Sequence, residues 1–199
     1  MFQIRIHGRG GQGVVTAAEL LSVAAFLEGI HAQAFPSFGS ERMGAPVMAF
    51  CRIDHKPIRL REPVTDPDAL IIQDPTLLHQ VELFDGLAAT GYTLLNSTRS
   101  FEELGLAEFV SKFPSGHCRT VPASEIALRH VGRPLPNAAL LGGFAAITGM
   151  LKIESVLAAI REKFPGDRFP SKIGEANAAA AREAYENVRR SLAVEAIHV

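Results

Sequence analysis

The residues best suited to chemistry lie near the start of the chain, where three glycines are spaced as in a phosphate-binding loop. Gly8, Gly10 and Gly13 fit the pattern G-x-G-x-x-G. They follow a short strand pattern and precede an Ala/Leu-rich helical stretch. A backbone without Cβ atoms can approach a pyrophosphate closely, and the N-terminus of a helix favours an anion. The sequence therefore predicts an anion-binding loop. The alternative is that the glycines only make a tight turn and close helix packing.

A dinucleotide is the usual ligand of such a loop, but the neighbouring residues disfavour one. A nicotinamide or flavin site has an acidic residue at the tip of the second strand. The expected second strand, Ile30–Phe35, contains neither Asp nor Glu, and Glu41 comes later, inside a loop. The first strand also contains Gln3 and Arg5, although a strand covered on both faces is normally apolar.

A second glycine-containing loop, residues 37–47, reads S-F-G-S-E-R-M-G-A-P-V and contains Glu41, Arg42 and Gly44. We expect it to lie beside the first loop at the carboxyl ends of the first two strands, where open α/β sheets bind ligands. Arg9 and Arg42 would then flank one cleft, and a guanidinium can donate two parallel hydrogen bonds to a phosphate. The alternative for Arg42 is a salt bridge with Glu41 or with a partner.

Further motifs along the chain extend these two loops into a family pattern. They are G-R-G-G-Q-G-V-V-T at residues 8–16, R-I-D-H-K-P-I-R at 52–59, D-P-T-L-L at 74–78, P-N-A-A-L-L-G-G-F-A at 136–145 and I-R-E-K-F-P at 160–165. Together with E-R-M-G-A-P, they make nearly the whole chain resemble the gamma subunits, or gamma domains, of the 2-oxoacid:ferredoxin oxidoreductases. The E-R-M-G-A-P form is most similar to the pyruvate type.

The resemblance implies a non-catalytic subunit of an enzyme that oxidatively decarboxylates pyruvate, or a related 2-oxoacid, to its acyl-CoA. Such complexes use thiamine diphosphate, Mg²⁺ and iron–sulfur clusters, with coenzyme A as co-substrate, and we expect this chain alone to bind no cofactor. The implied partners are alpha, beta and delta-type subunits, with ferredoxin or flavodoxin as the acceptor. The residues expected at the coenzyme A cleft or at a subunit junction are Gly8, Arg9, Gly10, Gly11, Gln12, Gly13, Glu41, Arg42 and Gly44.

Two other interpretations stay open. The chain could be a stand-alone nucleotide-binding enzyme, although the acidic ribose ligand and a general acid/base pair are missing from the pattern. It could also be a pure scaffold subunit whose glycine loop packs against another subunit and binds no ligand. No catalytic residue and no metal ligand are predicted in any of the motifs, and a structural hydrogen bond is the favoured role for His7.

Composition limits the possible classes of protein. The chain has 199 residues, a hydrophobic content of 47% and a net charge of −1, which suits one domain and gives no electrostatic reason to expect nucleic acid. The longest apolar run, residues 138–147, is too short to span a bilayer. Cys51 and Cys118 are far apart and suggest neither a disulfide framework nor a cluster site. We therefore expect a cytoplasmic protein without a signal peptide.

Strand patterns alternating with helical ones predict a three-layer, Rossmann-like α/β domain over residues 1–199. A hairpin signal in residues 47–60 predicts that its sheet is mixed and mostly parallel. Ser124 and Asn137 are expected as helix N-caps. The expected strands are 2–7, 30–35, 47–53, 57–60, 69–73, 93–96 and 117–121, and the expected helices include 14–27, 76–82, 124–130 and 137–150.

Overall fold

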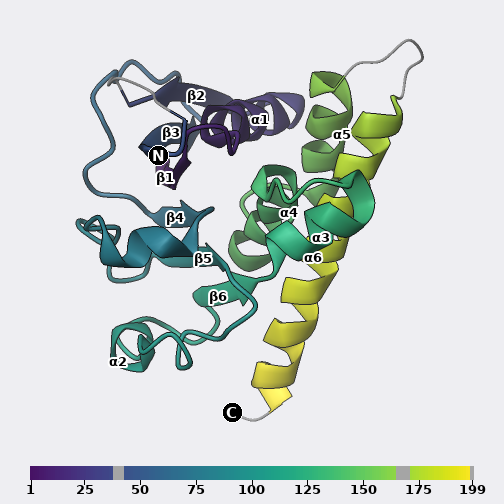
Figure 1. Ribbon diagram of the computed structural model, residues 1–199. Helices are drawn as coiled ribbons and strands as arrows, with labels where there is room; N and C mark the ends of the chain where they lie inside the picture. The colour runs from purple at the N-terminus through teal and green to yellow at the C-terminus, as the bar shows by residue number, and fades with distance from the viewer. Residues whose placement is uncertain (38–42, 165–170, 198–199) are drawn as a thin grey trace.

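A six-stranded sheet with the strand order β2-β3-β1-β4-β5-β6 forms the centre of the structure (Figure 1). The computed structural model describes residues 1–37, 43–164 and 171–197. Strand β3 runs antiparallel to both of its neighbours, whereas β1, β4, β5 and β6 pair in parallel, which confirms the predicted mixed, mostly parallel sheet. The strands are β1 (Phe2–Arg9), β2 (His31–Pro36), β3 (Pro46–Asp54), β4 (Ala69–Ile72), β5 (Tyr92–Asn96) and β6 (Cys118–Val121).

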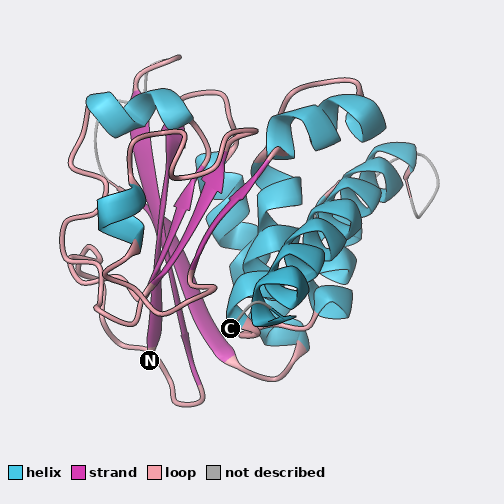
Figure 2. Ribbon diagram, turned by 90° about the horizontal axis from the view of Figure 1, so that it is seen from below, coloured by secondary structure: helices cyan, strands magenta, loops and turns pink. Residues whose placement is uncertain are grey.

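The helices are divided unequally between the two faces of the sheet (Figure 2). One face is covered by five α-helices, which contribute to the larger hydrophobic core. The other face is covered by a 3-10 helix, a one-turn helix and loops around a smaller core. The three predicted layers are therefore present, and one of them is thin. The helices are α1 (Val14–Leu27), η1 (Pro75–His79), α2 (Ala107–Val110), α3 (Ala123–Val131), α4 (Asn137–Thr148), α5 (Ile153–Lys163) and α6 (Lys172–Ile197).

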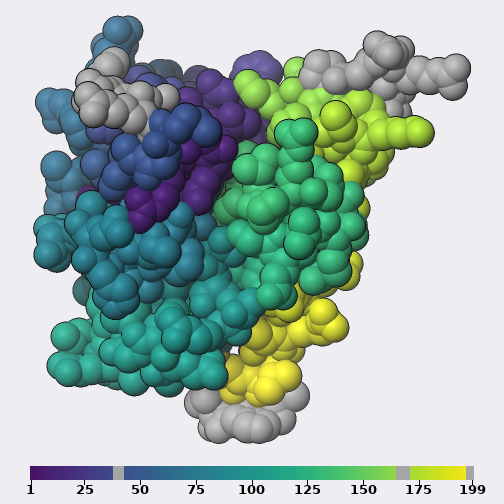
Figure 3. All heavy atoms as spheres, viewed as in Figure 1, coloured from purple at the N-terminus to yellow at the C-terminus, as the bar shows by residue number. Residues whose placement is uncertain are grey.

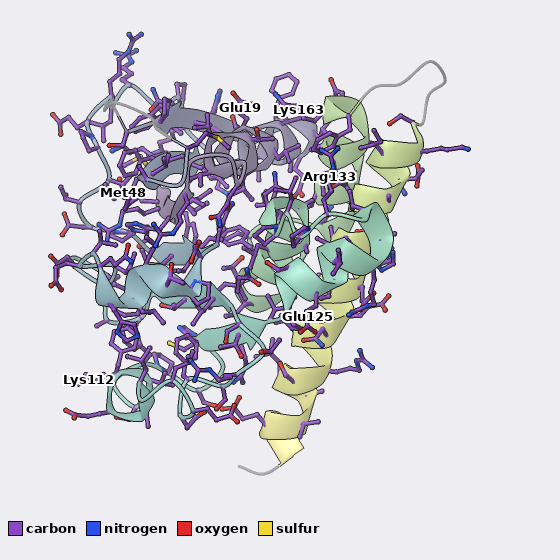
Figure 4. All side chains as sticks on the ribbon, in the orientation of Figure 1. Glu19, Met48, Lys112, Glu125, Arg133 and Lys163 are labelled. Atoms are coloured by element: carbon purple, nitrogen blue, oxygen red, sulfur yellow. The ribbon has the colours of Figure 1, made fainter. Side chains whose placement is uncertain are left out.

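Helix α4 is buried up to its last residue because its small side chains let neighbouring helices approach closely. Residues 137–147 are all buried. A Cβ atom on Gly142 would lie only 1.8 Å from the backbone oxygen of Ala181 on α6. The tight burial predicted for this Ala/Gly-rich segment is thus confirmed. At the surface, Lys163 on α5 donates to Glu19 on α1 at 2.7 Å. Both side chains are labelled in Figure 4.

The expected strand at residues 57–60 is wrong. This segment has no regular structure, and the chain beyond it is held by a side chain, since Arg52 donates to the backbone oxygen of Glu62 at 2.6 Å. Pro57 removes a backbone donor from any ladder there. The antiparallel part of the sheet comes instead from β3 pairing with β2 and β1. No helix within the described residues is long and apolar enough to cross a membrane.

Two helix starts and both predicted N-caps also differ from the expectation, whereas the predicted start at residue 137 is confirmed. The segment predicted as a helix over 76–82 is the short η1, which Asp74 caps by accepting from the backbone N–H of Thr76. Helices α3 and α4 are preceded at the N-cap position by Pro122 and Pro136 without side-chain caps, so neither Ser124 nor Asn137 is an N-cap. A fixed proline φ suits entry into a helix, so a proline takes the N-cap position before each of these helices.

Candidate functional site

The two glycine-containing loops meet at the carboxyl end of β1, as predicted. The backbone N–H of Gly10 donates to the oxygen of Ala45 at 2.9 Å, and the N–H of Gly44 donates back to the oxygen of Gly10 at 3.1 Å. Gly10 and Met43 also form an isolated β-bridge. Glu41 and Arg42 lie outside the described residues, so the contacts expected of these two side chains stay predictions.

Arg9 joins three separate segments of the chain. Its Nε donates to Asp74 Oδ2 at 3.1 Å, and one terminal nitrogen, Nη1, donates to the backbone oxygen of Gly44 at 2.9 Å. The other, Nη2, donates to Thr76 Oγ1 at 2.7 Å and to Gln80 Oε1 at 2.8 Å. Each nitrogen of the guanidinium therefore has a protein acceptor. Arg9 fastens the glycine loop to the second loop and to η1.

Asp74 is the acidic centre of this arrangement. Burial alone would raise the pKa of its carboxyl, but hydrogen bonds from Thr76 and Gln12 and the positive charge of Arg9 lower that pKa below its ordinary value. Gln12 donates its Nε2 to Asp74 Oδ2 at 2.9 Å and accepts from the backbone N–H of Arg9 through Oε1 at 2.8 Å. Asp74 thus stays an ionised anchor for both loops.

Backbone conformation and close packing explain why glycine occupies these positions of the first loop. Gly11 and Gly13 have positive φ angles of 92° and 73°, which L side chains rarely adopt. A Cβ on Gly8 would lie 2.6 Å from Val14 Cγ2, and one on Gly13 would lie 2.5 Å from Asn137 Nδ2. The turn therefore packs closely against the starts of α1 and α4.

His7 and Arg5 lie on the same side of β1 as Arg9. Arg5 donates its Nε to His7 Nε2 at 3.1 Å and reaches the backbone oxygens of Leu83 and Asp85 at 3.0 and 2.6 Å. Burial, and then the nearby charge of Arg5, lower the pKa of His7 to about 3. His7 is therefore neutral near pH 7, and the structural hydrogen bond predicted for it is confirmed.

The opposite side of the turn contains a residue that the motif analysis did not single out. Gln73, directly after β4, is 1% exposed, and neither end of its side-chain amide has a partner among the described residues. Its backbone oxygen accepts from Asn96 Nδ2 at 2.8 Å. The only signal in the sequence is a polar residue directly after the apolar run of β4.

Comparison with known proteins places the chain in a family. The family model described as "Pyruvate ferredoxin/flavodoxin oxidoreductase" matches residues 3–187. The chain belongs to this family. Within the pyruvate ferredoxin/flavodoxin oxidoreductase family it is similar to gamma-type subunits, which confirms the resemblance seen in the motifs.

Two relatives and one solved structure illustrate the similarity. The chain is 49% identical to the pyruvate/ketoisovalerate oxidoreductases common subunit gamma of Pyrococcus furiosus, over 94% of this chain and 96% of that one. It is 47% identical to the pyruvate synthase subunit PorC of Methanothermobacter marburgensis, over 96% and 99%. The crystal structure of the pyruvate oxidoreductase subunit PORC of Thermotoga maritima has a TM-score of 0.76 and 34% identity, over 93% and 95%.

The described residues do not supply the donors that an iron–sulfur cluster or a catalytic metal needs. They contain no group of three or more His, Cys, Asp or Glu side chains that could hold a metal ion. Cys51 and Cys118 are both buried and free. Burial raises the pKa of the Cys51 thiol to about 12 and that of the Cys118 thiol to about 11, whereas cluster ligands are thiolates.

Proposed function

We propose that this chain is the gamma subunit of a thiamine-diphosphate-dependent pyruvate:ferredoxin oxidoreductase, or of the corresponding enzyme for a related 2-oxoacid. The complex would form the corresponding acyl-CoA. The observation that carries the proposal is the near-full-length similarity to gamma subunits named for pyruvate oxidation or synthesis. Thiamine diphosphate, Mg²⁺ and the iron–sulfur clusters would be held by alpha, beta and delta-type subunits. Ferredoxin or flavodoxin would accept the electrons, and the complex would be cytoplasmic.

The geometry supports a positioning role for this chain within that complex. Arg9 and Asp74 are paired with each other and with protein groups, and His7 is held neutral. These side chains suit the fixing of loop shape better than the transfer of protons. The chain would therefore complete the complex without taking part in the chemical step.

We also propose that the glycine loop borders the coenzyme A cleft or a neighbouring subunit. The α1 N-terminus, after Gly13, has no side-chain cap and no acidic residue in its first turn, so its dipole favours an anion. Beside it Met43 is 86% exposed, and its Cε lies 3.0 Å from the position that a Cβ on Gly11 would take. An exposed, adaptable methionine next to bare backbone suits contact with another molecule.

Reconstitution tests the main proposal. Alpha, beta and delta-type subunits with this chain should reduce ferredoxin in a pyruvate- and coenzyme A-dependent reaction, and the same mixture without this chain should not. The isolated chain should contain no iron and bind no thiamine diphosphate. Full activity without this chain would overturn the proposal. Substrate oxidation by the isolated chain with a free nucleotide would favour the stand-alone enzyme instead.

Arg42 provides a separate test of the cleft. If its guanidinium contacts a coenzyme A phosphate, Arg42→Ala should lose about 1.5–3 kcal/mol of that interaction. This loss corresponds to an increase of about tenfold or more in the KM for coenzyme A, with little change in the KM for the 2-oxoacid. Arg42→Lys should recover only part of the loss, because an ammonium lacks the planar fork. An unchanged KM together with weaker assembly would assign Arg42 to a subunit interface.

A further inference from the structure

Strand β2 is the longer of the two edge strands of the sheet, and apart from its terminal Pro36 it lacks the usual protection of an edge. It pairs with β3 alone and contains no Lys, Arg, Asp or Glu. The other edge strand, β6, has only four residues, and one of them is Arg119. Proteins normally protect an open edge with charges, bulges or short strands, because its free backbone groups can pair with another chain. The unprotected edge at β2 therefore indicates that another chain covers it.

The free backbone groups of this edge belong to Ala32 and Ala34. In an antiparallel pair, residues that exchange hydrogen bonds with the neighbouring strand alternate with residues that do not. The backbone N–H of Ser37 donates to the oxygen of Met48 at 2.9 Å, which fixes the order of this alternation. The N–H and C=O groups of Ala32 and Ala34 therefore point away from the sheet. The bonds with β3 are made by every second residue, namely His31, Gln33 and Phe35.

A groove runs along this edge, between β2 and α1. It consists of two hollows of about 480 Å³ each, whose linings overlap. Ala32 and Ala34 face the larger core under the helices. Because these two side chains are small, the outer side of α1 has little to pack against. The α1–β2 groove is lined mainly by Ser22, Val23, Phe26, Leu27, Ala32 and Ala34.

The wall of the groove that α1 provides is apolar and exposed. Phe26 is 77% exposed and Leu27 is 47% exposed. Figure 3 shows that α1 (purple) reaches the upper surface of the molecule, beside α5 (green). An exposed apolar patch that borders a hollow is typical of a surface that binds another molecule. The free backbone groups of β2 and the apolar wall of α1 are therefore two separate signs of a partner at the same place.

We propose that the α1–β2 groove takes up an extended segment of a companion subunit, which adds to the sheet as a seventh strand. The proposal rests on the proposed function, because it places this partner within that complex. The backbone of the segment would exchange hydrogen bonds with Ala32 and Ala34. Successive side chains of a strand point to opposite faces of the sheet, so every second side chain of the segment would enter the groove beside Phe26. The segment must therefore have large apolar residues at alternate positions.

A second copy of this chain fits the groove less well than such a segment. If the β2 strands of two copies paired, the side chains that enter each groove would be the two alanines of the opposite copy. Two methyl groups would leave most of a hollow of about 480 Å³ unfilled. The groove thus favours a partner with larger apolar side chains than β2 itself has.

Hydrogen exchange, resolved residue by residue, tests the added strand. In the isolated chain the amide hydrogens of Ala32 and Ala34 should exchange quickly, and those of Gln33 and Phe35, which bond to β3, should exchange slowly. In the complex with alpha, beta and delta-type subunits, exchange at Ala32 and Ala34 should slow by about tenfold or more, and by more than at Gln33 and Phe35. Unchanged exchange at Ala32 and Ala34 in the assembled complex would overturn the proposal.

A substitution on α1 tests the groove. Phe26→Glu should hardly change the Tm of the isolated chain, because the side chain is largely exposed there. It should raise the Kd of this chain for the companion subunits by about tenfold or more, because docking would bury a charge. Leu128→Glu is the matched control, since Leu128 is a helical apolar residue that is 53% exposed but lies on α3 and lines neither hollow. Equal Kd values for the two variants would overturn the proposal.

The two proposals fail in different ways. If the companion subunits are fully active without this chain, the proposed function is wrong. If activity needs this chain but Phe26→Glu assembles with an unchanged Kd, only the assignment of the groove is wrong. Sedimentation of the isolated chain tests the remaining occupant. A dimer that Phe26→Glu dissociates would assign the groove to a second copy of this chain and would also overturn the proposal.

Discussion

The two sides of strand β1 are stabilised in opposite ways. Ile4 and Ile6 are completely buried against the helical layer. Arg5, His7 and Arg9 alternate with them and face the thin layer, where they make directional hydrogen bonds to loops and to η1. One side is held by the packing of apolar surface, and the other by a small number of polar contacts with fixed geometry.

This difference indicates what each side does. Apolar packing is non-directional and stabilises regular helices over a broad area. A buried arginine is costly to desolvate, but once it is in place it fixes the segments that accept its hydrogen bonds, and removing it leaves their oxygens unpaired. Arg5, Arg9 and Arg52 hold loops that have no ladder of their own. The thin layer therefore presents an irregular but well-defined surface, as a subunit of a complex requires.

The largest loss of stability is expected from a substitution on the helical side, at the closest approach of α4 and α6. Gly142→Ala places a Cβ 1.8 Å from the backbone oxygen of Ala181, which cannot move aside. We expect a loss of about 3–5 kcal/mol in the free energy of unfolding. Gly143→Ala is the matched control, because its Cβ would meet side-chain atoms alone, Leu94 Cδ2 at 3.0 Å and Val188 Cγ2 at 3.5 Å, and no backbone. Equal Tm values for the two variants would show that the α4–α6 contact is not tight.

A smaller loss of stability is expected from a substitution on the polar side of β1. Arg5→Met leaves the backbone oxygens of Leu83 and Asp85 without their donors, which should cost about 2–4 kcal/mol. Limited proteolysis should then cut near residues 83–86 before the rest of the chain. Arg61→Met, at an exposed position, serves as the control. Global unfolding without preferential cleavage would mean that Arg5 supports the core rather than the loop.

The sequence predicted the helical side better than the polar side, for a physical reason. Local periodicity defines α1 and the buried strands, so their bounds agree within about two residues. The meeting of the two glycine-containing loops follows from the strand–turn–helix order. The partners of Arg5 and Arg52 lie far away in sequence, and no local pattern encodes them. The same holds for Gln73, whose unpaired amide is visible only once α1 and α4 are placed beside β4.

The smallest expected effect is a pH dependence that comes from the polar side of β1. The pKa of His7 is about 3 in the folded chain, compared with its ordinary value of 6.5. Between these values the unfolded chain binds the extra proton and the folded chain does not, so the stability supplied by His7 is complete above pH 6.5 and is lost as the pH falls. Near pH 5.5 the slope should be about 1 kcal/mol per pH unit.

His7→Gln should remove this slope while it keeps an acceptor for Arg5. Denaturant unfolding of both chains between pH 7 and pH 5 gives the difference directly, and this range lies above the lowered pKa of carboxyls such as Asp74. Parallel curves for the two chains would mean that His7 becomes protonated in the folded state. Its Nε2 could then not accept from Arg5, and the neutral hydrogen bond between the two side chains would be wrong.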